Sequence, residues 1–165
     1  MKAKFFIRLV GLLAAVLIAS SDAVGRDSQK LLVGKVTRVS DGDTIWVSDR
    51  LGQRHKVRLN RIDAPESDQP FGKESTLHLQ SIVGNKEVTV EYENHDRYGR
   101  ILGIIRLGDE DVNLQMVRDG YAWHYRHFDN TPSYAAAESE ARTAKRGLWA
   151  TPAPIPPHQW RRRKR

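Results

Sequence analysis

The chain has 165 residues, no cysteine, and 27 basic against 20 acidic side chains, which give a formal net charge of +7. Without cysteine, a fold held together by disulfides is excluded. Three basic side chains and one acidic side chain lie in residues 1–23, and five basic ones lie in residues 161–165, which leaves 19 of each sign between them. A broadly basic surface is therefore excluded, and any affinity for phosphate must come from individually placed arginines.

Residues 1–23 have the pattern of a secretory signal peptide. Basic residues precede the apolar run LVGLLAAVLIA, and small residues follow at Ser21 and Ala23. The run is short for a membrane span. We therefore expect an exported protein, periplasmic or secreted, that has no stable membrane association once the signal is removed. An uncleaved N-terminal anchor is the alternative that this pattern leaves open.

Residues 24–150 are expected to form one domain, because no internal repeat interrupts them. Alternating and β-branched residues predict five strands, and apolar residues at helical spacing predict three helices. The strands are predicted at residues 32–39, 44–47, 54–62, 86–92 and 100–107, and the helices at residues 71–83, 112–118 and 133–147. This order favours an α+β fold, a five-stranded Greek-key barrel with about three α-helices.

Three separate motifs carry candidate chemistry. The turn SDGDT contains Asp43, the stretch VRLNRIDAPE contains Arg58, Asp63 and Glu66, and the turn HDRYGR contains Arg100. Taken alone, each motif is more typical of an ordinary turn or a solvated strand residue than of a site. Together they supply planar arginine donors for phosphate oxygens and carboxylates for a hard cation or a water molecule, a combination that suits phosphodiester chemistry.

The order and spacing of these motifs resemble one family. DGDT, RLNRIDAPE, YGR and a closing GLW, spread over residues 33–149, are similar to the thermonuclease, or staphylococcal (micrococcal) nuclease, family. The resemblance implies an OB-fold barrel. It also implies a catalytic Ca²⁺ held by two carboxylates and one main-chain carbonyl, which match Asp43, Asp63 and Ala64. Alanine stands where the best-known member has threonine, a change that keeps the carbonyl ligand.

The resemblance further implies the catalytic residues. Glu66 matches the carboxylate that orients or deprotonates the attacking water, and Arg58 and Arg100 match the arginines that hold the scissile phosphate. The implied reaction breaks the bond to the 5′ oxygen of DNA or RNA, without strong sequence specificity, and leaves 3′-phosphate ends. Tyr98 and Tyr125 are weaker candidates for nucleotide binding, since either could equally be a packing residue.

Two further expectations concern the whole chain. We expect a monomer, with a non-catalytic nucleic-acid-binding OB-fold module as the alternative function. Residues 151–165 are rich in proline and then basic, a composition that disfavours a helix and predicts an extended appendage. Whether this tail only solubilises the protein or binds phosphate is left open by its composition.

Overall fold

A computed structural model describes residues 29–163 of the chain. The predicted signal peptide at residues 1–23 lies outside the described residues, so that expectation stays a prediction. Within residues 29–163, none of the helices has the length and apolar character that crossing a membrane requires.

A closed barrel forms the body of the molecule, as the sequence predicted. Its strands are β1 (Lys30–Asp41), β2 (Thr44–Asp49), β3 (Arg54–Leu59), β5 (Glu87–His95) and β6 (Ile101–Leu107). The first three form an antiparallel meander, β1 also pairs with β5, and β5 pairs with β6. A parallel pairing of β3 with β6 closes the barrel. The short β7 (Glu110–Asp111) pairs antiparallel with the end of β6. Closure leaves few free strand edges and fixes the relative positions of the turns.

The predicted strand at residues 54–62 is interrupted in the structure. Asn60 and Arg61 form a turn after β3, and Arg61 adopts a left-handed backbone conformation with φ of 67°. The chain then enters the short strand β4 (Ile62–Asp63), which pairs with β8 (Trp123–His124) instead of with the barrel sheet. Because of this break, Asp63 does not pair within the barrel sheet. It pairs with Trp123 of β8 instead.

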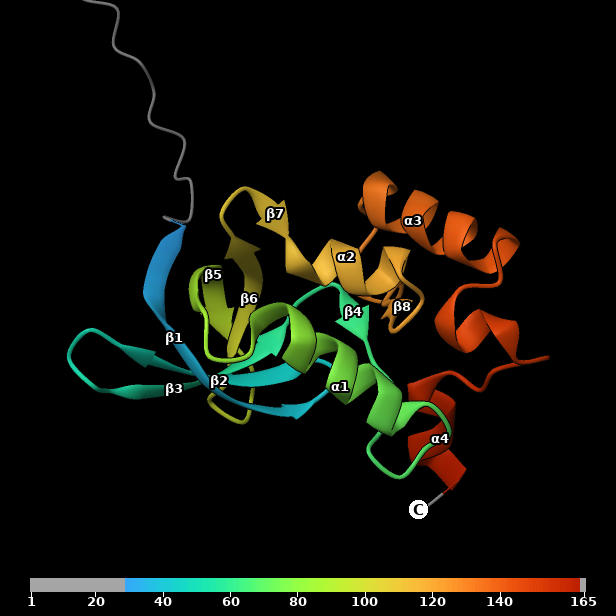
Figure 1. The fold of residues 1–165 in the computed structure, drawn as a ribbon, viewed down its shortest axis with the longest axis horizontal. Coiled ribbons are helices and arrows are strands. Elements are labelled where there is room, and N and C mark those ends of the chain that lie inside the picture. Colours follow the sequence, from blue (N-terminus) through green and yellow to red (C-terminus); the bar gives the residue numbers. More distant parts are fainter. Residues whose placement is uncertain (1–28, 164–165) are drawn as a thin grey trace, which may run out of the picture.

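The helices are more numerous than predicted. The structure contains α1 (Gly72–Val83), α2 (Val112–Arg118), α3 (Pro132–Thr143), the 3-10 helix η1 (Gly147–Ala150) and α4 (Pro157–Arg163). In Figure 1 the barrel strands gather on the left, and α2, α3 and α4 lie on the right. The first two α-helices match the predicted ones closely, and α3 begins within a residue of its predicted start but ends at Thr143, four residues before the predicted end. The fourth has no predicted counterpart, and the expectation of an extended tail is wrong: residues 157–163 are helical.

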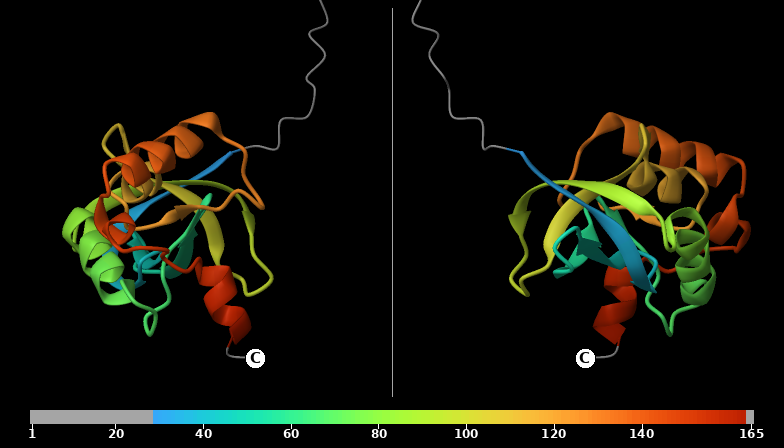
Figure 2. Two further views of the ribbon diagram at one scale, coloured as in Figure 1. Left: turned by 90° about the vertical axis from the view of Figure 1, so that its right-hand side faces the viewer. Right: turned by 60° about the vertical axis from the view of Figure 1, so that its left-hand side comes forward.

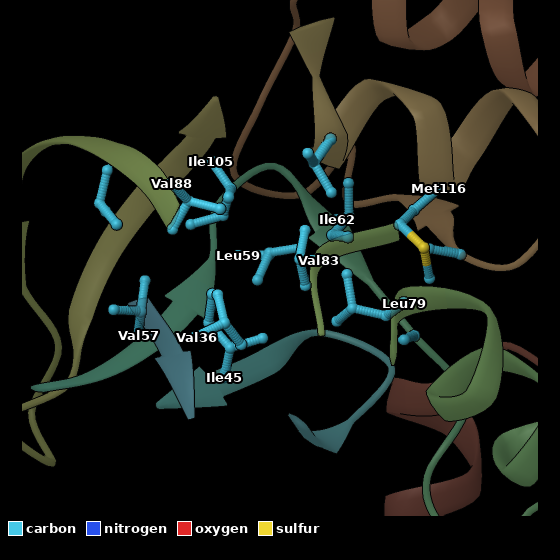
Figure 3. Close-up of a cluster of buried hydrophobic side chains, with 14 of the residues drawn as sticks. Val36, Ile45, Val57, Leu59, Ile62, Leu79, Val83, Val88, Ile105 and Met116 are labelled. Carbon is cyan, nitrogen blue, oxygen red and sulfur yellow. The ribbon is translucent and has the colours of Figure 1, made fainter. Parts of the chain in front are cut away.

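The core joins the barrel to the helices. Figure 3 shows Val36, Ile45 and Leu59 from the strands meeting Leu79 of α1 and Met116 of α2, all of them almost fully buried. Burial of each such side chain contributes about 1.5–3 kcal/mol. The strand ends that carry the candidate site are therefore attached to a well-packed scaffold.

Candidate active site

One cleft of about 750 Å³ collects nearly all of the predicted site residues. Its lining includes Asp43, Arg58, Ala64, Glu66, Tyr98, Arg100 and Tyr125. Asp63 is almost fully buried in the wall and lines an adjoining cavity of about 470 Å³. Three motifs that are far apart in the sequence therefore converge at one end of the barrel.

The turn between β1 and β2 is pressed against α1. A Cβ atom on Gly42 would lie 2.0 Å from the Ser75 hydroxyl oxygen, so only glycine fits this approach. The amide of Asp43 donates to Asp41 at 3.0 Å. The amide of Ala64 donates to the Asp43 carboxylate at 2.8 Å. These contacts hold the Asp43 side chain in a buried position beside Ala64.

Burial and crowding change the acidity of this turn. Burial, followed by the nearby charge of Asp43, raises the pKa of Asp41 to about 7. Burial also raises the pKa of Asp63 above its ordinary value, although hydrogen bonds from Arg161 oppose the shift. The site thus concentrates negative charge in a poorly hydrated place, an arrangement that a cation would stabilise.

Arg58 lies between the two buried carboxylates. Cross-strand pairing places it opposite Thr44, next to Asp43. Its guanidinium group forms an ion pair with Asp43 and donates to the Asp63 carboxylate at 3.2 Å, with only 14% of the side chain exposed. Although burial by itself lowers the pKa of Arg58, the surrounding carboxylates raise it above its ordinary value. Arg58 therefore stays charged.

Glu66 lies on the loop between β4 and α1. Its carbonyl accepts from the Gln69 amide at 2.9 Å. Gly72 packs so closely on this loop that a Cβ atom there would lie 1.9 Å from the Glu66 carbonyl oxygen. The loop is thus fixed against the start of α1. The Glu66 side chain is 37% exposed, so water has access to its carboxylate.

Arg100 lies in the turn between β5 and β6 and lines the same cleft. The Asp96 carboxylate accepts from Arg100 Nε at 2.7 Å, and also from the backbone amides of Tyr98 and Arg100. These hydrogen bonds lower the pKa of Asp96 although burial opposes the shift. Asp96 therefore positions Arg100. The sequence alone did not identify Asp96 as a site residue. The signal was present, because an aspartate at the start of a turn such as DRYGR commonly accepts a hydrogen bond from the backbone amide two residues later.

The two tyrosines flank the cleft. Tyr98 is 68% exposed, and Arg97 lies over its ring at 4.8 Å. Tyr125 packs edge to face against the exposed Phe128 at 4.8 Å between ring centroids. Both positions are compatible with stacking on a base, and nucleotide binding by these residues stays a prediction.

Arg161 of α4 is the unexpected member of the site. Its guanidinium group donates to both oxygens of the Asp63 carboxylate at 3.1 Å and to the Glu66 carboxylate at 2.6 Å. The sequence interpretation placed this residue in a solvated tail. Arg161 lies 95 positions after Glu66 in the sequence, and no local sequence pattern links the two residues.

A metal ion at this site would need ligands other than His, Cys, Asp and Glu side chains to complete its coordination. Among residues 29–163, no three His, Cys, Asp or Glu side chains cluster closely enough to hold a metal ion. Asp43 and Asp63 converge on the same guanidinium group. Two buried carboxylates with a nearby main-chain carbonyl form a set of hard oxygen donors, the type that Ca²⁺ and Mg²⁺ prefer.

Comparison with known proteins gives a consistent result. A family model described as "Staphylococcal nuclease homologue" matches residues 56–151, which include Arg58, Asp63, Glu66 and Arg100. The chain is 48% identical over 132 residues to an "Uncharacterized endonuclease" of Escherichia coli, a match that covers 79% of this chain and 86% of the relative. A relative of the same description in Haemophilus influenzae is 39% identical, covering 79% and 74%. The "Probable staphylococcal-like nuclease CAN2" of Oryza sativa is 40% identical, covering 70% and 31%.

Proposed function

This chain belongs to the staphylococcal nuclease family and is a phosphodiester-cleaving hydrolase, and on that premise we propose that it is an exported, calcium-dependent nuclease of DNA and RNA. The observation that carries the proposal is the cleft in which the buried Asp43 and Asp63 lie beside Arg58, with Glu66 and Arg100 in the same lining. A non-catalytic binding module has no need of buried acids next to arginines.

Asp43, Asp63 and the Ala64 carbonyl are the proposed metal ligands. The donor chemistry fits, because both side chains are buried carboxylates that supply hard oxygen donors. Calcium, with its preference for oxygen ligands, is the proposed ion. When bound, a divalent cation would polarise the phosphate and offset the charge that develops during hydrolysis.

Glu66 is the proposed activator of water. Its carboxylate is accessible to solvent, and a carboxylate in this position can orient a water molecule or accept its proton as the oxygen attacks phosphorus. In-line attack would break the bond between phosphorus and the 5′ oxygen, leaving a 3′-phosphate on one fragment and a 5′-hydroxyl on the other.

Arg58 and Arg100, which both line the cleft, are proposed to hold the scissile phosphate together. Each is oriented by carboxylates, Arg58 by Asp43 and Asp63 and Arg100 by Asp96. Preorganised guanidinium donors stabilise the extra negative charge of the five-coordinate transition state. Contacts to phosphate read no base edge, so we propose broad activity on DNA and RNA. We also propose that the protein acts as a monomer.

An assay of the purified protein tests the reaction. Cleavage of DNA and RNA should require calcium, stop in excess chelator, and give fragments with 3′-phosphate ends, detected by their resistance to 3′ extension until a phosphatase is added. Full activity in excess chelator would refute the calcium dependence. Binding of nucleic acid without cleavage would support the non-catalytic module instead.

Export is proposed from the pattern of residues 1–23 alone. N-terminal sequencing of the protein recovered outside the cytoplasm should begin shortly after Ala23. Recovery of the full-length chain in the membrane fraction would favour an uncleaved anchor.

A further inference from the structure

The C-terminal segment is folded back over the candidate active site. The Gln69 side chain donates to the Ile155 carbonyl at 2.6 Å, and the Trp160 indole donates to the Asp68 carboxylate at 3.1 Å. Pro157, the first residue of α4, is buried. In both views of Figure 2, α4 lies beside the loop that joins β4 to α1. The segment is therefore held on the loop that carries Glu66.

Arg161 places a positive charge on two residues of the proposed chemistry. One edge of its guanidinium group donates to both oxygens of Asp63, and the same group also donates to Glu66. This two-point contact is the strong geometry of arginine with a carboxylate. Although burial by itself lowers the pKa of Arg161, its hydrogen bonds with Asp63 and Glu66 raise it above its ordinary value.

This contact conflicts with the chemistry proposed for the same carboxylates. Both oxygens of Asp63 are engaged by Arg161, and one of them is also engaged by Arg58. A divalent cation on Asp63 would lose ligand oxygens to the guanidinium group and be repelled by its charge. The Glu66 oxygen that Arg161 contacts at 2.6 Å is occupied by the guanidinium group and is less available to a water molecule.

The contact is also one that can open without unfolding the barrel. The Arg161 side chain is 40% exposed, and Asp63 keeps its interior pairing with Arg58 when Arg161 leaves. The seven-residue helix α4 contributes no residue to the hydrophobic core clusters of residues 29–163, and a segment with few buried apolar contacts can open locally while the rest of the fold stays intact. The barrel core does not depend on it.

We infer that α4 is an autoinhibitory latch, in which Arg161 occupies the place of the cation on Asp63, pairs with Glu66 as well, and is displaced when the divalent cation binds. The inference rests on the proposed metal site. A latch of this kind would keep the enzyme inactive wherever free calcium is scarce, and would couple metal binding to release of the basic C-terminal helix.

Calcium affinity measured by calorimetry tests the latch without reference to activity. Arg161→Gln removes the competing charge and should bind Ca²⁺ about fivefold to a hundredfold more tightly than the unaltered protein, the usual range of coupling between two sites. Arg163→Gln removes one charge from the exposed end of the same helix and should stay within about twofold, a limit set by the weak interaction of screened surface charges.

Each result has a distinct meaning. Equal affinity in the Arg161→Gln and unaltered proteins would overturn the latch and leave the metal site standing. Weaker binding by Arg161→Gln would overturn it as well, since Arg161 would then support the site. If none of the three proteins bound Ca²⁺, the metal site and the latch would both be wrong.

A distance measurement tests the movement itself. Because the chain has no cysteine, spin labels can be attached at Gln159→Cys on α4 and Leu51→Cys on the exposed turn after β2. Saturating Ca²⁺ should broaden the distance distribution of the labelled protein, and Arg161→Gln should show the broad distribution without Ca²⁺. An unchanged distribution in both cases would overturn the latch.

Discussion

The two walls of the cleft hold their arginines in different ways. On the barrel wall, formed by Asp43, Arg58 and Asp63, the charged side chains are buried and come from three places, the turn between β1 and β2, strand β3 and strand β4. On the loop wall, formed by Asp96, Tyr98 and Arg100, they are more exposed and belong to one turn. The barrel wall depends on the tertiary fold, whereas the loop wall is organised by the single carboxylate of Asp96.

This difference separates stability from catalysis. A buried ion pair that loses one partner leaves an uncompensated charge in a poorly hydrated place, so changes on the barrel wall affect folding as well as function. An exposed ion pair contributes little to stability. Substitutions on the loop wall should therefore affect chemistry much more than stability.

Glu66 provides the largest expected effect, and it belongs to neither wall. Glu66→Gln keeps the size of the side chain but removes the charge that activates water, so turnover should fall by about 10² to 10⁴. Because the carboxylate is partly exposed, the melting temperature should hardly change. Turnover on short oligonucleotides and thermal unfolding are measured side by side. A variant that keeps most of its rate at neutral pH would show that another group activates the water.

The two arginines compare the walls directly. Arg58→Lys and Arg100→Lys keep the charge but lose the planar grip on phosphate, so each should lower turnover about 10² to 10³-fold. Only Arg58→Lys should also lower the melting temperature, because it disturbs buried carboxylates.

Arg50→Lys, in the exposed turn after β2, is the matched control and should be silent. Near-normal turnover in both site variants would refute the arginine clamp. Equal losses of stability in both would remove the distinction between the walls.

Asp96 should affect turnover by positioning Arg100 on the loop wall. Asp96→Asn keeps an oxygen that can accept from the backbone amides but loses the ionic hold on Arg100, so turnover should fall roughly tenfold to a hundredfold through misplacement of the guanidinium group. Asp109→Asn, an exposed residue after β6, serves as the control. If kcat stays normal while KM alone rises, Arg100 contributes only to ground-state binding.

The smallest expected effect is on stability in acid. Hydrogen bonds lower the pKa of Asp96 in the folded protein, so its contribution is present above the unfolded pKa and is lost as pH falls through the folded one. The unaltered protein should exceed Asp96→Asn by less than about 1 kcal/mol at neutral pH. The difference should vanish below the ordinary aspartate range. Chemical denaturation at several pH values measures it, and a pH-independent difference would contradict this account.

Local patterns were sufficient for much of the fold. Alternation predicted the five barrel strands, and helical spacing predicted α1 and α2 within a residue of their observed bounds. The break after β3 was missed because it depends on pairing of β4 with β8, which lies about 60 residues further along the chain.

The sequence by itself determined the barrel, its order of elements, and the three motifs that meet in the cleft, because strand alternation and turn chemistry are local properties and the motifs lie at strand ends. Only the tertiary structure decided which carboxylates face Arg58, that Asp96 orients Arg100, and that Arg161 returns to Asp63 and Glu66. The tail composition disfavoured a helix. Its contacts with Gln69 and Asp68 accompany a helix nonetheless, since packing on a folded surface overrides a weak local preference.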